Sequence, residues 1–149
     1  MLNIDLSKKT EEKIDVLCHA AGIIFAKPYM ETTVEELRRS LEINVVGMDV
    51  CSRSVLRHMI QLKDGKIVVI CSAASREGKP NLAHYTALKY GDHGPLQSIA
   101  LSVAEYGINV NGLCPGFLFI LSGSFGNIQI CQLFKIENTR LIKQEDLIL

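Results

Sequence analysis

The apolar and polar positions of the chain fall into blocks that predict strands and helices in turn. Three short apolar runs, at residues 14–18, 67–71 and 108–114, predict buried strands. Between them, residues 33–63 and a segment that begins near residue 82 carry apolar side chains at helical spacing. The order strand, helix, strand, helix, strand is typical of an α/β fold with a parallel sheet.

Local signals predict the helix boundaries. Thr33 and Glu36 form a capping box, which satisfies free amides at a helix start. Gly47 predicts a bend in this helix, and Gly107 predicts the end of the next one. That second helix is interrupted by three helix-breaking residues: Gly91, Gly94 and Pro95. A proline inside a helix costs on the order of 3 kcal/mol, so we expect this helix to be bent or to start late.

Composition points to an ordinary globular protein of one domain. Of the 149 residues 48% are hydrophobic and 21% are charged, and the formal net charge is zero. No basic field attracts nucleic acid or an anionic membrane, so neither partner is expected. No leader sequence opens the chain, and no apolar run approaches the ~20 residues of a membrane span. We therefore expect a cytoplasmic protein.

Cysteine and histidine spacing gives no metal motif. The chain has four His and five Cys, without C-x-x-C or H-x-x-x-H spacing. Several of the cysteines lie in apolar, strand-like runs, which favours reduced core residues. The sequence therefore predicts no metal site for Cys18, Cys51, Cys71, Cys114 and Cys131.

Candidate chemistry gathers where the second strand passes into the second helix. Ser72 follows that strand, at the sheet edge where α/β folds bind ligands. Tyr85 and Lys89 stand four residues apart on the helix, so both side chains leave from one face. An ammonium group near a phenol stabilises the phenolate and so makes a general acid/base. Alone, the Y-x-x-x-K spacing is a weak signal, and a serine at a strand end is usually a cap.

The wider spacing strengthens this interpretation. Ser72 lies thirteen residues before Tyr85 (85 − 72), and Asn44 lies twenty-eight before Ser72 (72 − 44). The chain also has I-D-V-L-C-H-A-A-G at residues 14–22 and Y-G-I-N-V-N-G-L-C-P-G at residues 106–116. With these motifs the chain resembles the short-chain dehydrogenase/reductase family. The resemblance implies the second, βαβαβ half of a Rossmann-like, doubly wound parallel sheet.

The resemblance implies a role for each residue of the tetrad. Tyr85 is the acid/base, Lys89 favours its phenolate, Ser72 orients the substrate, and the backbone carbonyl of Asn44 holds a relay water. It also implies binding of NAD or NADP. The matching cofactor contacts are Ala20, Ala21, Gly22, Tyr85, Lys89, Pro115, Gly116 and Leu118.

Departures from the family pattern lie at both ends. The chain has no T-G-x-x-x-G-x-G turn, whose glycines let the backbone approach the cofactor pyrophosphate. Asp5 resembles the Asp after the third strand of the family, although a polar residue of a frayed terminus explains it equally well. We expect a partial, truncated domain at residues 1–118. Residues 119–149 are expected to form a divergent, irregular tail without the family's substrate lid.

Two further departures lie inside the matched region. His19 replaces the first Asn of the family's Asn-Asn-Ala-Gly turn; it can still donate a hydrogen bond, but a structural role is favoured. Ser75 stands where relatives often have Gly and could stiffen the loop after Ser72.

Two classes of function remain open. The first is an oxidoreductase that moves hydride between a nicotinamide cofactor and a secondary alcohol or ketone, with sugar alcohols and sugar acids as candidate substrates. The second is a non-catalytic remnant that keeps the tetrad without holding the cofactor. Such a remnant would associate through its two long helices, which in the family pack into homodimers and homotetramers. The sequence does not distinguish NAD from NADP.

Overall fold

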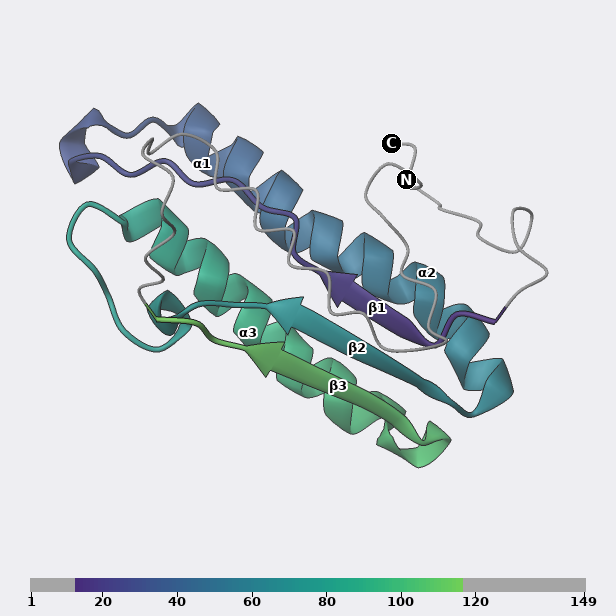
Figure 1. The fold of residues 1–149 in the computed structure, drawn as a ribbon. Helices are drawn as coiled ribbons and strands as arrows, with labels where there is room; N and C mark the ends of the chain where they lie inside the picture. The colour runs from purple at the N-terminus through teal and green to yellow at the C-terminus, as the bar shows by residue number, and fades with distance from the viewer. Residues whose placement is uncertain (1–12, 117–149) are drawn as a thin grey trace, which may run out of the picture.

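The computed structural model describes residues 13–116 and shows a parallel three-stranded sheet with helices packed against it (Figure 1). The strand order is β1-β2-β3, and both pairs of neighbours run parallel. The strands are β1 (Val16–His19), β2 (Gly65–Ile70) and β3 (Ile108–Leu113). The helices are α1 (Val34–Leu41), α2 (Gly47–Leu62) and α3 (Ala83–Val103), with a π-helical turn η3 (Glu42–Val46) and short 3-10 turns η2 (Tyr29–Glu31), η4 (Ala73–Ser75) and η5 (Ala104–Tyr106). The predicted α/β fold is confirmed; Asp5, Leu118 and the predicted tail lie outside the described residues.

The first predicted helix is confirmed as a continuous helical run through α1, η3 and α2. The hydroxyl of Thr33 accepts a hydrogen bond from the Glu36 amide at 3.2 Å, and the Glu36 carboxylate accepts one from the Thr33 amide at 2.9 Å. The capping box therefore forms as predicted. At Gly47 the structure has the end of the π-helical turn, a departure from regular helix that is frequent at functional sites.

The predicted late start of the second helix is wrong. Helix α3 begins at Ala83 and runs through Pro95 to Val103. Three of its buried side chains, Leu88, Leu96 and Val103, are at most 5% exposed. Burying each stabilises the fold by about 1.5–3 kcal/mol, which together exceeds the ~3 kcal/mol cost of the proline.

Gly91 does not interrupt α3 but allows η3 to pack closely against it. A Cβ atom at this position would lie 3.0 Å from Val45 Cγ2 of η3, tighter than ordinary contact. The missing side chain therefore lets η3 approach α3 two residues after Lys89 (91 − 89).

The core lies between the sheet and its helices. Both long helical runs lie behind the sheet in Figure 1, the arrangement that right-handed crossovers produce. On the covered face, Ile67 and Val69 of β2 are 0% exposed. The core is completed by buried side chains of the sheet, of its adjoining loops and of the helices: Ile14, Leu17, Met48, Val55, Met59, Cys71, Leu96, Val103 and Ile108.

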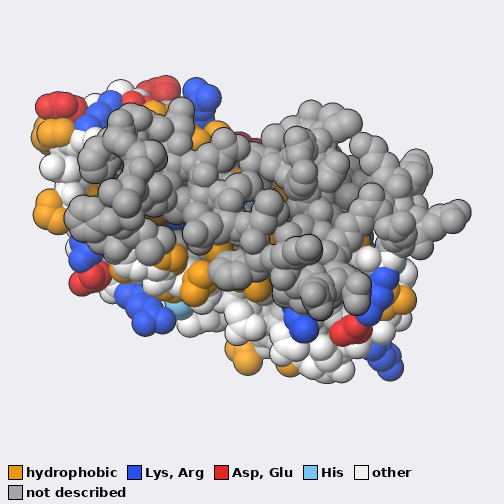
Figure 2. Space-filling view, viewed as in Figure 1, with side chains coloured by type: hydrophobic (Ala, Val, Ile, Leu, Met, Phe, Trp, Pro, Cys, Tyr) orange, Lys and Arg blue, Asp and Glu red, His pale blue; other side chains and the backbone are white. Residues whose placement is uncertain are grey.

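Charged side chains of both signs are interspersed on the side shown in Figure 2, among the residues that are coloured there. Within residues 13–116, no helix combines the length and apolar character needed to cross a membrane. Three cysteines of this region are free thiols: Cys51, Cys71 and Cys114. The cytoplasmic location stays a prediction.

Candidate active site

The loop after β2 fixes Ser72. Ser72 caps the 3-10 turn η4, because its hydroxyl accepts a hydrogen bond from the Ala74 amide at 3.2 Å. In return the Ser75 hydroxyl accepts one from the Ser72 amide at 3.2 Å. Ser75 is 3% exposed. The structure thus gives Ser72 the cap role that its position suggested, and the Ser75 hydroxyl holds the loop, as the stiffening prediction proposed.

The loops after β2 and β3 are tied to each other. The Cys71 amide donates to the Leu113 carbonyl at 2.8 Å, and the Ala73 amide donates to the Pro115 carbonyl at 2.9 Å. These bonds continue the strand pairing past the ends of the strands. Ser72 and the Pro115–Gly116 segment therefore lie at the same edge of the sheet.

Tyr85 and Lys89 lie together on α3, as predicted. The Lys89 Nζ atom lies 5.9 Å from the centre of the Tyr85 ring. Lys89 is 7% exposed and donates to the Ile70 carbonyl at 3.0 Å, at the end of β2. This bond places the ammonium group beside the strand end that leads to Ser72, so three of the four tetrad residues belong to one structural unit.

Asp92 is a buried partner of Lys89 that the sequence interpretation missed. Its Oδ2 atom accepts a hydrogen bond from Lys89 Nζ at 2.9 Å, and the residue is 2% exposed. Burial raises the pKa of Asp92, while the positive charge of Lys89 opposes that rise. The three-residue spacing of Lys89 and Asp92 is visible in the sequence. Their burial is not, and burial is what makes breaking this ion pair costly in stability.

Asn44 lies buried in the π-helical turn. Its side-chain amide donates to the carbonyls of Ser40 at 2.9 Å and Ile23 at 3.2 Å. Its Oδ1 atom has no hydrogen-bond partner within the described part of the chain. The backbone carbonyl shares the Gly47 amide with the Glu42 carbonyl, which leaves it capacity to accept from a water.

Gly22 is required by Asn44. A Cβ atom at Gly22 would lie 2.4 Å from Asn44 Oδ1, closer than real contacts allow. The sequence interpretation assigned this glycine to close approach of a cofactor. The structure shows that it also makes room for the tetrad residue.

His19 is a buried, neutral residue next to the charge of Lys89. It is 7% exposed, and its Nε2 atom has no partner among residues 13–116. Burial, and secondarily the positive charge of Lys89, lower the pKa of His19 to about 4. Ala20, Ala21 and Gly22, which follow it at the end of β1, are exposed or half-buried.

The described arrangement brings a phenol, a buried ammonium and a hydroxyl to the carboxyl edge of a parallel sheet. A phenol and an ammonium group side by side are the groups that a general acid/base uses, and a hydroxyl at the same edge can hydrogen-bond an oxygen of a bound molecule. Asn44 approaches this unit from η3, which contacts α3. Leu118 lies outside the described residues, and its cofactor contact stays a prediction.

Comparison with known proteins agrees with this geometry. The family model described as short chain dehydrogenase matches residues 4–119. The chain is 36% identical over 104 residues to 2-dehydro-3-deoxy-D-gluconate 5-dehydrogenase of Formosa agariphila, covering 70% of this chain and 39% of that protein. It is 37% identical over 117 residues to sorbitol-6-phosphate 2-dehydrogenase of Escherichia coli, covering 76% and 45%.

A solved structure shows the same fold. The gluconate 5-dehydrogenase of Burkholderia cenocepacia, in complex with NADP and tartrate, superposes with a TM-score of 0.71 at 31% identity. The match covers 75% of this chain and 44% of that one. The chain thus spans about two-fifths of the length of such relatives.

Proposed function

Because this chain belongs to the short chain dehydrogenase family, we propose that it transfers hydride between NAD or NADP and a secondary alcohol or ketone. The observation that carries the proposal is the Tyr85–Lys89 pair. Its ammonium group is buried, bonded to the end of β2 and 5.9 Å from the phenol ring centre. A phenol with an ammonium group fixed beside it supplies the proton donor and acceptor that general acid/base catalysis requires.

Each tetrad residue has one task in this proposal. Tyr85 accepts the proton of the substrate alcohol, or gives it back to the ketone. Ser72 donates a hydrogen bond to the same substrate oxygen and stabilises the charge that develops there. The Asn44 carbonyl holds a water that passes the proton toward Lys89.

The residues present fit part of a nicotinamide–ribose site. Ala20, Ala21 and Gly22 line one strand end and Pro115 and Gly116 another. At Gly116 a Cβ atom would meet no atom of residues 13–116 within 4 Å. When bound, the cofactor supplies or accepts the hydride, and the protein binds and orients it. These 149 residues do not contain the glycine-rich pyrophosphate turn, so binding is the first property to measure.

Sugar alcohols and sugar acids are the substrate class that we propose. The relatives named above act, by their names, on a deoxygluconate, a sorbitol phosphate and gluconate. All three compounds carry secondary hydroxyl groups next to further polar groups, which suits a serine hydroxyl that orients one oxygen.

The test is titration of the chain with NADH and with NADPH, followed by nicotinamide fluorescence and then by turnover of polyols and sugar acids. Tyr85→Phe should bind cofactor and lose turnover by a hundredfold or more, in line with the ~10²–10⁴ of acid/base catalysis. Tyr90→Phe is the matched control, since Tyr90 lies on the same helix and is 48% exposed. Absence of binding up to millimolar cofactor would favour the non-catalytic alternative.

We also propose that the chain self-associates as a homodimer or homotetramer through α3. Tyr90 and Leu101 lie three helical turns apart on the same side of α3 and are 48% and 83% exposed. Both apolar side chains can pack against the same face of a second copy of the chain. Light scattering should show a mass above the monomer that falls toward it in the double variant Tyr90→Glu and Leu101→Glu. A monomeric mass for the unchanged chain would contradict the proposal.

A further inference from the structure

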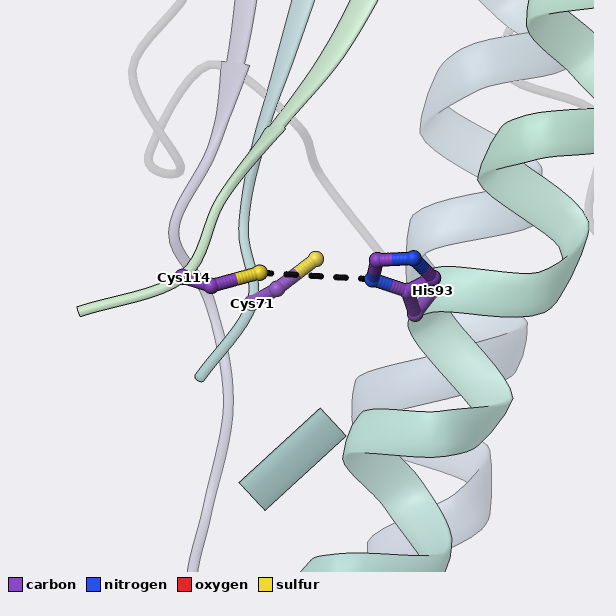
Figure 3. A group of neighbouring side chains, drawn as sticks. All are labelled: Cys71, His93 and Cys114. Carbon is purple, nitrogen blue, oxygen red and sulfur yellow. Dashed lines mark hydrogen bonds between the residues drawn. The ribbon is translucent and has the colours of Figure 1, made fainter. Parts of the chain in front are cut away.

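Cys71, His93 and Cys114 form a cluster of three metal-ligating side chains (Figure 3). The cysteines follow β2 and β3 directly, and the histidine lies on α3. All ligand atoms lie within 4.8 Å of one another, and Cys114 Sγ lies 4.0 Å from His93 Nδ1. In Figure 3 both sulfur atoms lie on the side of the strands that faces the imidazole ring.

Strand register brings the two cysteines together. Ile70 pairs with Leu113, so the next residue of each strand, Cys71 and Cys114, leaves the sheet at the same level. Gly112 keeps the space beside them clear, because a Cβ atom there would lie 3.2 Å from the Cys71 sulfur. The cluster is therefore a consequence of the fold and not of a local spacing motif.

We propose that Cys71, His93 and Cys114 bind a soft divalent metal ion, with Zn²⁺ as the expected occupant. Thiolate and imidazole are ligands that zinc prefers, and three protein ligands leave a fourth tetrahedral position for water. With Zn–S of about 2.3 Å and Zn–N of about 2.0–2.1 Å, the sulfur–nitrogen separation in a tetrahedral site is about 3.5 Å. The pair at 4.0 Å must close by only about 0.5 Å, which small side-chain rotations supply.

Charge and access both suit such a site. Two thiolates balance the two positive charges of zinc, and each thiol that binds releases its proton to solvent. Cys71 is buried, whereas His93 and Cys114 are half-buried, so the ion can enter from the solvent side. Mg²⁺ and Ca²⁺ prefer oxygen ligands and should not bind here.

Gln97 can orient the histidine. Its Nε2 atom lies 3.1 Å from His93 Nε2, the ring nitrogen that points away from the cysteines. Metal binding at Nδ1 leaves the proton on Nε2, and a half-turn of the Gln97 amide presents its oxygen to that proton. Such outer partners fix the ring and typically contribute 10–100-fold in metal affinity.

The test is titration of the full, reduced chain with Co²⁺, a spectroscopic stand-in for zinc, in buffer without chelators. We expect thiolate-to-cobalt charge-transfer absorption that saturates at one ion per chain, disappears on adding Zn²⁺ and is unaffected by Mg²⁺. His93→Gln and Cys114→Ser should weaken binding by at least about tenfold. Cys51→Ser is the matched control and should bind as the unchanged chain does.

The proposal fails if the reduced chain gives no charge-transfer absorption, or if His93→Gln and Cys114→Ser bind cobalt unchanged. It also fails if Cys71 and Cys114 form a disulfide in air while the reduced chain binds no ion. Circular dichroism of the metal-free variants checks folding. If Cys114→Ser does not fold, Gln97→Ala replaces it and should weaken binding about tenfold, with exposed Ser98→Ala as its control. None of these measurements depends on hydride transfer.

Discussion

Two pairs of side chains follow one another along the same stripe of α3. Tyr85 and Lys89 form the first pair, and His93 and Gln97 continue at the same four-residue spacing. Lys89 is bonded to a carbonyl and a carboxylate inside the protein, whereas His93 has one exposed neighbour and a sulfur 4.0 Å away. The first pair is thus held by the fold itself, while the second would gain its full set of bonds from a metal ion.

The largest expected effect is a loss in the free energy of unfolding when Lys89, of the first pair, is replaced. Lys89→Met removes the only positive charge that pairs with Asp92 among the described residues, and leaves a carboxylate that is 2% exposed. Breaking a buried ion pair in this way costs about 3–5 kcal/mol. Urea unfolding should show this loss, and the double variant Lys89→Met with Asp92→Leu should recover most of it.

His93→Gln is the comparison for that experiment. In metal-free buffer it should cost at most about 1 kcal/mol, since it removes one exposed hydrogen bond and one long sulfur contact of a half-buried ring. An equal loss for His93→Gln and Lys89→Met would mean that the two pairs are held alike.

The positive charge of Lys89 also affects the pKa of His19 on β1. Because burial and Lys89 lower the pKa of His19 from 6.5 to about 4, the folded chain holds this ring neutral where the unfolded chain protonates it. The stability from the neutral ring is complete above pH 6.5 and is lost as the pH falls from 6.5 toward 4. The loss amounts to about 3 kcal/mol.

His19→Asn should remove this part of the pH dependence. The measurement is the free energy of unfolding at several pH values for both chains. The difference between them isolates His19 from the other histidines. Parallel curves for the two chains between pH 6.5 and 4 would contradict a buried neutral His19.

Sequence alone predicted the part of this comparison that depends on local spacing. The Thr33–Glu36 capping box and the Tyr85–Lys89 pair each lie within one or two helical turns, so their geometry follows once the helix is predicted. The strands were predicted because their apolar runs are short and bounded by turn residues.

Features that depend on tertiary packing were missed. The buried Lys89–Asp92 pair and the Cys71–His93–Cys114 cluster arise from strand register and from the packing of α3 on the sheet. The predicted late start of the helix with Pro95 was wrong for the same reason. Burial of core side chains outweighs the low helix propensity of proline there. Spacing rules carry no information on such contacts.

Gly22→Ala tests how tightly Asn44 is held beside the first pair. The new Cβ atom would lie 2.4 Å from Asn44 Oδ1, so the amide or the backbone must move. Such overpacking costs about 1–3 kcal/mol. Thermal unfolding should show the loss. Gly78→Ala, where a Cβ atom meets no described residue within 4 Å, should change stability by at most about 0.5 kcal/mol. Equal changes in stability for Gly22→Ala and Gly78→Ala would mean that the Asn44 side chain can move aside at little cost.

The smallest expected effect concerns the loop that carries Ser72. Ser75→Ala removes the hydroxyl that accepts from the Ser72 amide at 3.2 Å, a neutral hydrogen bond with a net contribution of about 1 kcal/mol. Ser98→Ala, at an exposed position of α3, should change stability by at most about 0.5 kcal/mol. Thermal unfolding of the two variants should show a difference of about 1 kcal/mol. If they do not differ, the strand-end bonds from Cys71 and Ala73 to the β3 side are sufficient to hold Ser72, and Ser75 is not needed for its position.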